Sequence, residues 1–317
     1  MGKIIVYANN KSEVLASKVQ DYIFDSVADN TKRGYTSDFK KFSAWCSASG
    51  LVSLPADPQT LALYFTYMAE SGLKASTIER SRAAISMAHE LKGLVCPVFD
   101  RKVKQTLKGI RRKIGTAKNK KAPVLSRDIK AMLSALPEGL IGIRDKAILL
   151  IGFAGAFRRS ELIDISIEHI EVTAEGLKIL IPKSKTDQEG AGRLVAIKRG
   201  RNAVTCPVRA YLDWIAAAAI TSGQVFRSID RHTNIKLPIT SQSIALIVKR
   251  AAVAAGLDST KYSGHSLRAG FVTQGALNGA SESNIMRQTG HKSHDTVRGY
   301  IRIANVFKNN VSGMLGL

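Results

Sequence analysis

The chain has 317 residues, 45% of them hydrophobic, which is enough for two globular domains with ordinary cores. Its 47 lysines and arginines outnumber its 25 aspartates and glutamates, and the net charge of +22 favours a polyanionic partner, nucleic acid before an anionic membrane. The composition argues against a membrane protein and a zinc site, because no apolar run approaches the roughly 18 residues of a spanning helix and the three cysteines lie far apart.

The N-terminal third of the sequence predicts a helical domain. Residues 1–23 show little pattern and are expected to form a mobile lead-in. Apolar residues then recur at helical spacing in segments separated by glycines, which predicts a compact bundle over residues 24–113. Polar residues mark two helix starts: Asp57 stands before a proline as a capping residue, and Ser76 with Glu79 has the pattern of a capping box.

A strongly basic segment ends this bundle. Residues 101–121 hold ten lysines and arginines and no acidic residue. The first half continues the helical pattern, while residues 114–123 have the composition of a linker. A solvated helix face followed by a flexible joint would explain the segment, but so many uncompensated charges favour contact with phosphates.

Residues 124–317 are predicted to form a mixed α/β domain that is mostly helical. The segment 169–198 reads as three antiparallel strands with turns at 174–176 and near 190–192. Helical patterns follow as far as residue 304. The expected fold class is therefore mainly α, with one small three-stranded antiparallel sheet.

The usual catalytic motifs for nucleic acids and esters are missing from the sequence. It has no Gly-rich loop ending in Gly-Lys-Ser/Thr, no cluster of carboxylates for Mg²⁺ and no G-x-S-x-G elbow. A basic protein without these motifs can still attack a phosphodiester with its own nucleophile. Such a site needs fixed cations and donors around the phosphate, and a tyrosine qualifies as nucleophile where nearby cations favour the phenolate.

Seven residues could supply such a site, and each alone has a more ordinary reading as a surface ion pair, an exposed hairpin lysine or a core aromatic. They are Arg158 with Glu161 three positions later, Lys185 at a hairpin tip, His265 with Arg268 three positions later, and His291 nine positions before Tyr300. Their order and spacing together carry much more information than any single pair.

This order of Arg-x-x-Glu, hairpin Lys, His-x-x-Arg and Gly-His with a later Tyr resembles the tyrosine recombinase (phage integrase) family. The upstream helices, from FSAWCSASG to IRRK, resemble the core-binding domain of the Cre-type members, so the resemblance covers residues 24–317. It implies a helical core-binding domain (24–113), a basic linker (114–123) and a catalytic domain (124–317) that form a C-shaped clamp around duplex DNA.

The resemblance also implies a role for each residue. Arg158 and Arg268 would grip the scissile phosphate, Lys185 would protonate the leaving 5′ oxygen, His265 would manage the phenol proton, His291 would donate to a phosphate oxygen, Glu161 would brace the site, and Tyr300 would form a 3′-phosphotyrosyl link. Strands could then be exchanged through a Holliday junction without ATP, metal or another cofactor.

One departure and one weaker set of residues accompany these roles. The family usually has Gly-Leu-Arg before its first arginine, whereas here Gly155 is followed by Ala-Phe-Arg-Arg, so Arg159 is an alternative to Arg158. Residues in regions that resemble the DNA-facing surfaces of the family are Lys32, Arg33, Arg111, Arg112, Lys113 and Gln242.

The resemblance finally implies an assembly and a setting. The apolar segment 301–317 would dock into a neighbouring protomer, and four protomers would assemble on two inverted-repeat DNA sites, in the cytoplasm of a prokaryote with a plasmid or phage. A type IB topoisomerase or a telomere resolvase would use the same chemistry. A DNA-binding regulator that no longer cleaves is the alternative of a different class, and it would be expected to have lost some of these groups.

Overall fold

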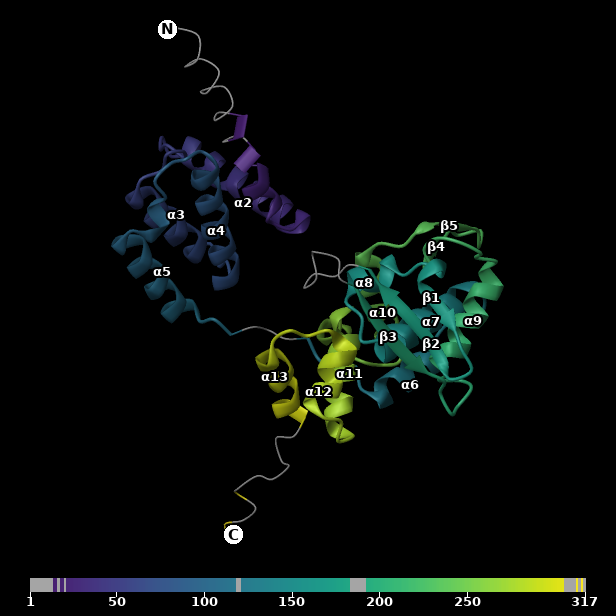
Figure 1. Cartoon of the computed structure of the whole chain (residues 1–317). Coiled ribbons are helices and arrows are strands. Elements are labelled where there is room, and N and C mark those ends of the chain that lie inside the picture. Colours follow the sequence, from purple (N-terminus) through teal and green to yellow (C-terminus); the bar gives the residue numbers. More distant parts are fainter. Residues whose placement is uncertain are drawn as a thin grey trace. The chain divides into compact units, whose positions relative to one another are not determined.

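A computed structural model describes residues 14–15, 18–19, 21–117, 121–182, 192–304, 312 and 315. The chain divides between Asn119 and Lys120 into two compact units, both drawn in Figure 1. Within the described residues, no helix is long and apolar enough to cross a membrane.

The secondary structure of the first unit, in its described part from residue 29 onward, consists of helices joined by turns and loops. Its helices are α2 (Asp29–Ala48), α3 (Pro58–Glu70), α4 (Ala75–Leu91) and α5 (Arg101–Ile114), with a short 3-10 helix at Pro97–Phe99. Helix α2 packs on α4 and α3 packs on α5. The predicted helical character of this segment is confirmed.

One of the two predicted caps in this unit is confirmed and the other is wrong. The Asp57 carboxylate accepts the backbone N–H of Thr60 at 2.9 Å, which satisfies one of the orphan donors at the start of α3. Helix α4 begins at Ala75, one residue before Ser76, and no side chain in the described part of the chain caps it. Glu79 pairs instead with Arg82 on the next turn, at 2.6 Å.

Aromatic side chains and one histidine hold the first unit together. Phe42 and Phe65 are fully buried, and the ring of Tyr64 lies 4.9 Å from that of Phe42. Buried His89 accepts the Ala56 N–H at its Nε2, 3.0 Å away, so Nδ1 carries the proton that it donates to the carbonyl of the preceding helical turn. This histidine therefore ties the loop before α3 to helix α4.

The second unit combines helices with two small sheets. Its helices are α6 (Ser126–Ser134), α7 (Leu140–Ala154), α8 (Arg159–Asp164), α9 (Pro207–Ala218), α10 (Ser241–Ala254), α11 (His265–Leu277), α12 (Glu282–Thr289) and α13 (His294–Ala304). Its strands are β1 (Ile170–Val172), β2 (Gly176–Ile181), β3 (Arg193–Lys198), β4 (Arg227–Ile229) and β5 (Ile235–Pro238), and 3-10 turns lie at Ile167–His169 and Ser259–Lys261.

The predicted three-stranded antiparallel sheet is confirmed. Its order is β1-β2-β3, and Ile179 lies opposite Val195 on the buried face. Arg193 lies on the same face, two residues before Val195, because side chains alternate along a strand. The second sheet, β4-β5, was not predicted, since its strands of three and four residues are short and one ends in a proline.

The core of the second unit is built around α7, and the C-terminal helices form a smaller cluster. Helices α9 and α11 pack on α7, and α11 also contacts α12 and α13 (yellow in Figure 1). Gly270 of α11 allows the segment before α6 to lie against this helix, since a Cβ there would lie 1.9 Å from the carbonyl oxygen of Val124. In the smaller cluster, Val272, Ile285 and Val297 are buried against the ring of Tyr300.

Candidate active site

Arg158 and Glu161 form a buried pair at the start of α8. Arg158 is the N-cap residue, and both its backbone N–H and its Nη1 donate to the carboxylate of Glu161. The Glu161 side chain is only 1% exposed, so this is not the surface ion pair that the spacing alone would suggest. Burial by itself would raise the pKa of Glu161, but the Arg158 N–H and the charge of Arg193 outweigh it and lower that pKa.

Arg268 on α11 lies next to this pair and is almost wholly buried. It is 1% exposed, and its Nη1 donates to the carbonyl oxygen of Ala156 at 2.7 Å. Ala156 has φ of +52°, a left-handed conformation that is rare for a residue with a Cβ and recurs at functional sites. Burial and the charge of Arg158 lower the pKa of Arg268 to about 9, so at neutral pH it remains a cation that an anion would stabilise.

His291 faces Arg268 from the loop after α12. Arg268 Nη2 donates to His291 Nε2 at 3.1 Å, and Nδ1 of the ring lies 2.7 Å from the hydroxyl of Thr289. That hydroxyl donates to the Ile285 carbonyl at 2.8 Å, so it accepts from His291 Nδ1–H. Burial and then Arg268 lower the pKa of His291 to about 3, and the imidazole is therefore neutral with its free lone pair toward the arginine.

His265 and Tyr300 meet across the helices α11 and α13. The phenol oxygen lies 3.0 Å from His265 Nε2. Burial, followed by the charges of Arg268, Arg159 and Arg158, lowers the pKa of His265. A neutral His265 can accept the phenol proton, which is the geometry of a nucleophile beside its base.

Two opposing effects act on the phenol of Tyr300. The charge of Arg268 favours the phenolate, as expected of a nearby cation, but burial raises the pKa of the phenol more than Arg268 lowers it. The proton therefore stays on the phenol until a base removes it, and His265 lies at hydrogen-bonding distance for that role.

The structure thus brings together Arg158, Glu161, His265, Arg268, His291 and Tyr300. Lys185 lies outside the described residues. Arg159, the alternative to Arg158, is exposed, and the stem of its side chain lies against Gly264. No group of three or more His, Cys, Asp or Glu side chains that could hold a metal is found among the described residues.

The residues expected to face DNA have different surroundings. Arg33 and Gln242 are exposed near the starts of α2 and α10, and Arg111, Arg112 and Lys113 are exposed at the end of α5. Lys32 is the least available of the set, because its ammonium group pairs with Asp25 at 2.7 Å and lies over the ring of Phe24.

Two residues that sequence reasoning missed touch this site, Thr289 and Arg193. Arg193 donates to Glu161 at 2.8 Å. The sequence did contain a feature that indicates Arg193: a charged residue two positions before Val195 falls on the buried face of a strand. Thr289 carried no such signal, because threonine near a helix end is ordinary.

Residues 124–305 match the model of the phage integrase family. The chain is 40% identical over 304 residues to an integrase/recombinase xerD homolog of Selenomonas ruminantium, a match that covers 94% of this chain and 89% of that protein. It is 26% identical over 310 residues to the recombinase cre of Escherichia phage P1, covering 92% and 90% of the two chains. Among solved structures, the Tn1549 transposon integrase in complex with transposon right end DNA has a similar fold, with a TM-score of 0.61 and 15% identity over 90% of this chain and 93% of that one.

Proposed function

Because the chain belongs to the phage integrase family, we propose that it is a site-specific DNA recombinase that cleaves and rejoins duplex DNA through Tyr300. The observation that carries the proposal is the phenol of Tyr300, 3.0 Å from His265 and beside the buried cation of Arg268. Arginines suit a phosphodiester because their planar fork meets two phosphate oxygens and keeps its charge.

In the cleavage step, Tyr300 Oη attacks the scissile phosphorus while His265 Nε2 takes its proton. The new bond joins the phenol oxygen to the 3′ phosphate, the bond from phosphorus to the 5′ oxygen breaks, and Lys185 protonates that oxygen. Arg158 and Arg268 neutralise the charge that builds up on the phosphate. The phosphotyrosyl ester conserves the bond energy, so a second 5′ hydroxyl can reverse the step, and strand exchange through a Holliday junction needs neither ATP nor a metal.

His291 must change its hydrogen-bonding role when DNA binds. Without an anion its Nε2 accepts from Arg268. A phosphate held by the arginines raises the pKa of an adjacent imidazole, since it offsets the positive charges that lower it. The protonated His291 then donates to a phosphate oxygen.

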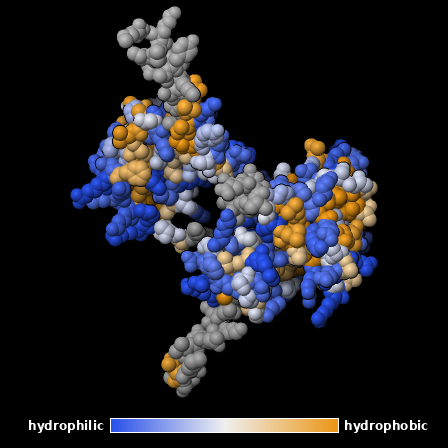
Figure 2. All heavy atoms as spheres, in the orientation of Figure 1, coloured by the Kyte–Doolittle hydropathy of each residue, from blue (hydrophilic) through white to orange (hydrophobic). Residues whose placement is uncertain are grey.

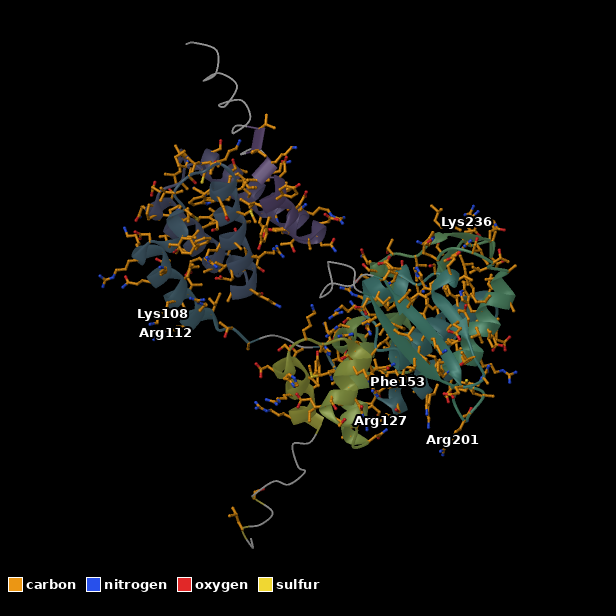
Figure 3. The ribbon with its side chains drawn as sticks, viewed as in Figure 1. Lys108, Arg112, Arg127, Phe153, Arg201 and Lys236 are labelled. Carbon is orange, nitrogen blue, oxygen red and sulfur yellow. The ribbon has the colours of Figure 1, made fainter. Side chains whose placement is uncertain are left out.

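We assign DNA binding outside the active site to the helical domain (24–113), the linker (114–123) and the catalytic domain (124–317) acting as a clamp. The exposed face of α5 supports this assignment. Lys108 and Arg112 project from it four residues apart (Figure 3), and the surface around α5 is strongly hydrophilic (Figure 2). Such a face contacts phosphates without reading sequence, so its contribution to affinity falls with salt.

We further propose that four protomers assemble on two inverted-repeat sites and exchange the segment 301–317. The sequence of that segment is apolar enough to seek a protein surface, and most of it lies outside the described residues. Helix α13, which carries Tyr300, is anchored to α12 because Glu282 accepts from Arg298 at 3.2 Å and from His294. Exchange of the following segment would couple assembly to the position of the nucleophile.

The proposal is tested by measuring whether the protein forms a covalent adduct with DNA. The protein is incubated with sheared genomic DNA of its source cell, quenched in SDS, and DNA that stays attached after denaturation is measured. Wild type should form adducts, Tyr300→Phe should form none while still binding DNA, and Tyr262→Phe should behave like wild type. A wild-type protein that binds but leaves no adduct would indicate a non-cleaving regulator, and the bound sequence in a positive result identifies the target.

The two neighbouring arginines can be separated in the same assay. Arg158→Lys should reduce adduct formation by about 100-fold or more, because removing one preorganised donor costs about that factor. Arg159→Lys keeps a cation at an exposed position and should stay within about threefold of wild type. The reverse result would assign the phosphate to Arg159.

A further inference from the structure

A third arginine, Arg193, is built into the site although it lies on a strand of the sheet. Its side chain is 18% exposed. Nη2 donates to Glu161 Oε2 at 2.8 Å and Nη1 donates to the carbonyl oxygen of Gln288 at 2.9 Å. Its buried Nε has no hydrogen-bond partner in the described part of the chain. Holding an arginine this far from water is costly unless its charge is used.

The two partners of Arg193 lie next to two different groups of the site, Arg158 and His291. Glu161 holds Arg158 through its other oxygen. Gln288 is the last residue but one of α12, three positions before His291, and its side-chain amide also donates to the carbonyls of Ala154 and Ala196. The last turn of α12 is therefore fastened to β3 by both residues.

Gly290 completes this contact. It adopts φ of +65°, and a Cβ there would lie 2.9 Å from Nε and 3.0 Å from Cδ of Arg193. The guanidinium thus lies directly under the turn that leads into His291. In the sequence, the segment that carries Lys185 also runs straight into β3, which begins at Arg193.

We propose that Arg193 is a positioning residue that fixes Arg158 and His291 relative to each other through Glu161 and the end of α12. The inference rests on the proposed function, because it concerns the placing of groups around the scissile phosphate. Arginine is required since its rigid fork can donate to two acceptors in different directions, whereas a lysine offers a single point charge. Misplacing such groups by a fraction of an ångström is enough to slow the chemistry.

The experiment measures single-turnover adduct formation at saturating DNA, using the duplex recovered from wild-type adducts. Arg193→Gln should slow the reaction about 10- to 100-fold, the loss expected for a hydrogen bond between charged groups, while DNA affinity changes less than about threefold. Arg193→Lys should recover part of the rate. Arg199→Gln is the matched control: Arg199 follows the same strand, donates to the carbonyls of Ala174 and Thr173 and should leave the rate unchanged.

A double-mutant cycle separates positioning through Glu161 from an independent effect. Arg193→Gln should add little to the loss already caused by Glu161→Gln, because both changes break the same connection. A wild-type rate for Arg193→Gln, an equal loss in Arg199→Gln, or fully additive losses would overturn the inference. If Arg193→Gln does not fold, Arg193→Lys decides, and a wild-type rate overturns it. The absence of adducts from wild type would instead refute the proposed function.

Discussion

Replacing Glu161 with glutamine removes the buried negative charge that two partly buried arginines share. The carboxylate is 1% exposed and receives Arg158 on one side and Arg193 on the other. Breaking a buried ion pair by removing one partner costs about 3–5 kcal/mol, because the remaining charge is left buried and unpaired. Glutamine keeps the shape and one acceptor oxygen, so we expect the lower end, about 3 kcal/mol of unfolding free energy.

That loss should be visible as a fall in melting temperature. For a unit of this size, about 1 kcal/mol corresponds to 2–4 °C, so the transition of the second unit should fall by roughly 6–12 °C. Inorganic phosphate should stabilise Glu161→Gln more than wild type, since the variant has a larger uncompensated positive charge. Differential scanning calorimetry with and without phosphate measures both effects. A decrease in melting temperature of less than about 2 °C would show that the ion pairs of Glu161 contribute little to stability. Equal stabilisation of both proteins by phosphate would also contradict this interpretation.

Comparing Glu161→Gln with wild type also tests how the stability of the protein depends on pH. Folding lowers the pKa of Glu161 below its ordinary value of 4.5. The carboxylate therefore contributes its full stability above that value and loses it as the pH falls through the lower folded pKa. The stability gap between wild type and Glu161→Gln should be constant near neutral pH and close only below about pH 4.5. A gap that closes between pH 7 and 5 would point to another group.

Two further predictions concern α11 and the turn before His291. Gly270→Ala should destabilise the second unit by about 1–3 kcal/mol, because its Cβ would collide with the Val124 carbonyl, whereas Gly275→Ala on the same helix meets its nearest atom at 3.6 Å and should be neutral or stabilising. Chemical denaturation of the pair checks this, and equal effects would contradict it. Thr289→Val should slow adduct formation about threefold to tenfold by removing the hydroxyl that fixes the His291 tautomer. An unchanged rate, with unchanged imidazole nitrogen shifts by NMR, would show that the hydroxyl does not set the tautomer.

Much of this molecule could be predicted where the chain encodes structure locally. The helical periodicity, the Asp57 cap and the alternation in β2 and β3 each depend on neighbours within a few residues, and the structure confirms them. The family was also predicted from motif order, and the comparisons confirm it over residues 124–305.

The parts that could not be predicted depend on contacts between distant segments. Arg193 meets Glu161 across 32 positions and Gln288 across 95, so no local pattern reveals its partners. The pKa of Tyr300 rises because folding buries the phenol, which the count of nearby arginines could not show. Helix α4 begins at Ala75 although Ser76 and Glu79 have the spacing of a capping box, and Glu79 pairs with Arg82 instead.

In the proposed reaction, the phenol of Tyr300 becomes covalently joined to DNA. Nuclease digestion of SDS-resistant adducts, followed by proteolysis and tandem mass spectrometry, identifies the residue that carries the nucleotide. We expect one modified peptide, with a 3′-linked nucleotide on Tyr300. A nucleotide on any other residue, or adducts that persist in Tyr300→Phe, would contradict it.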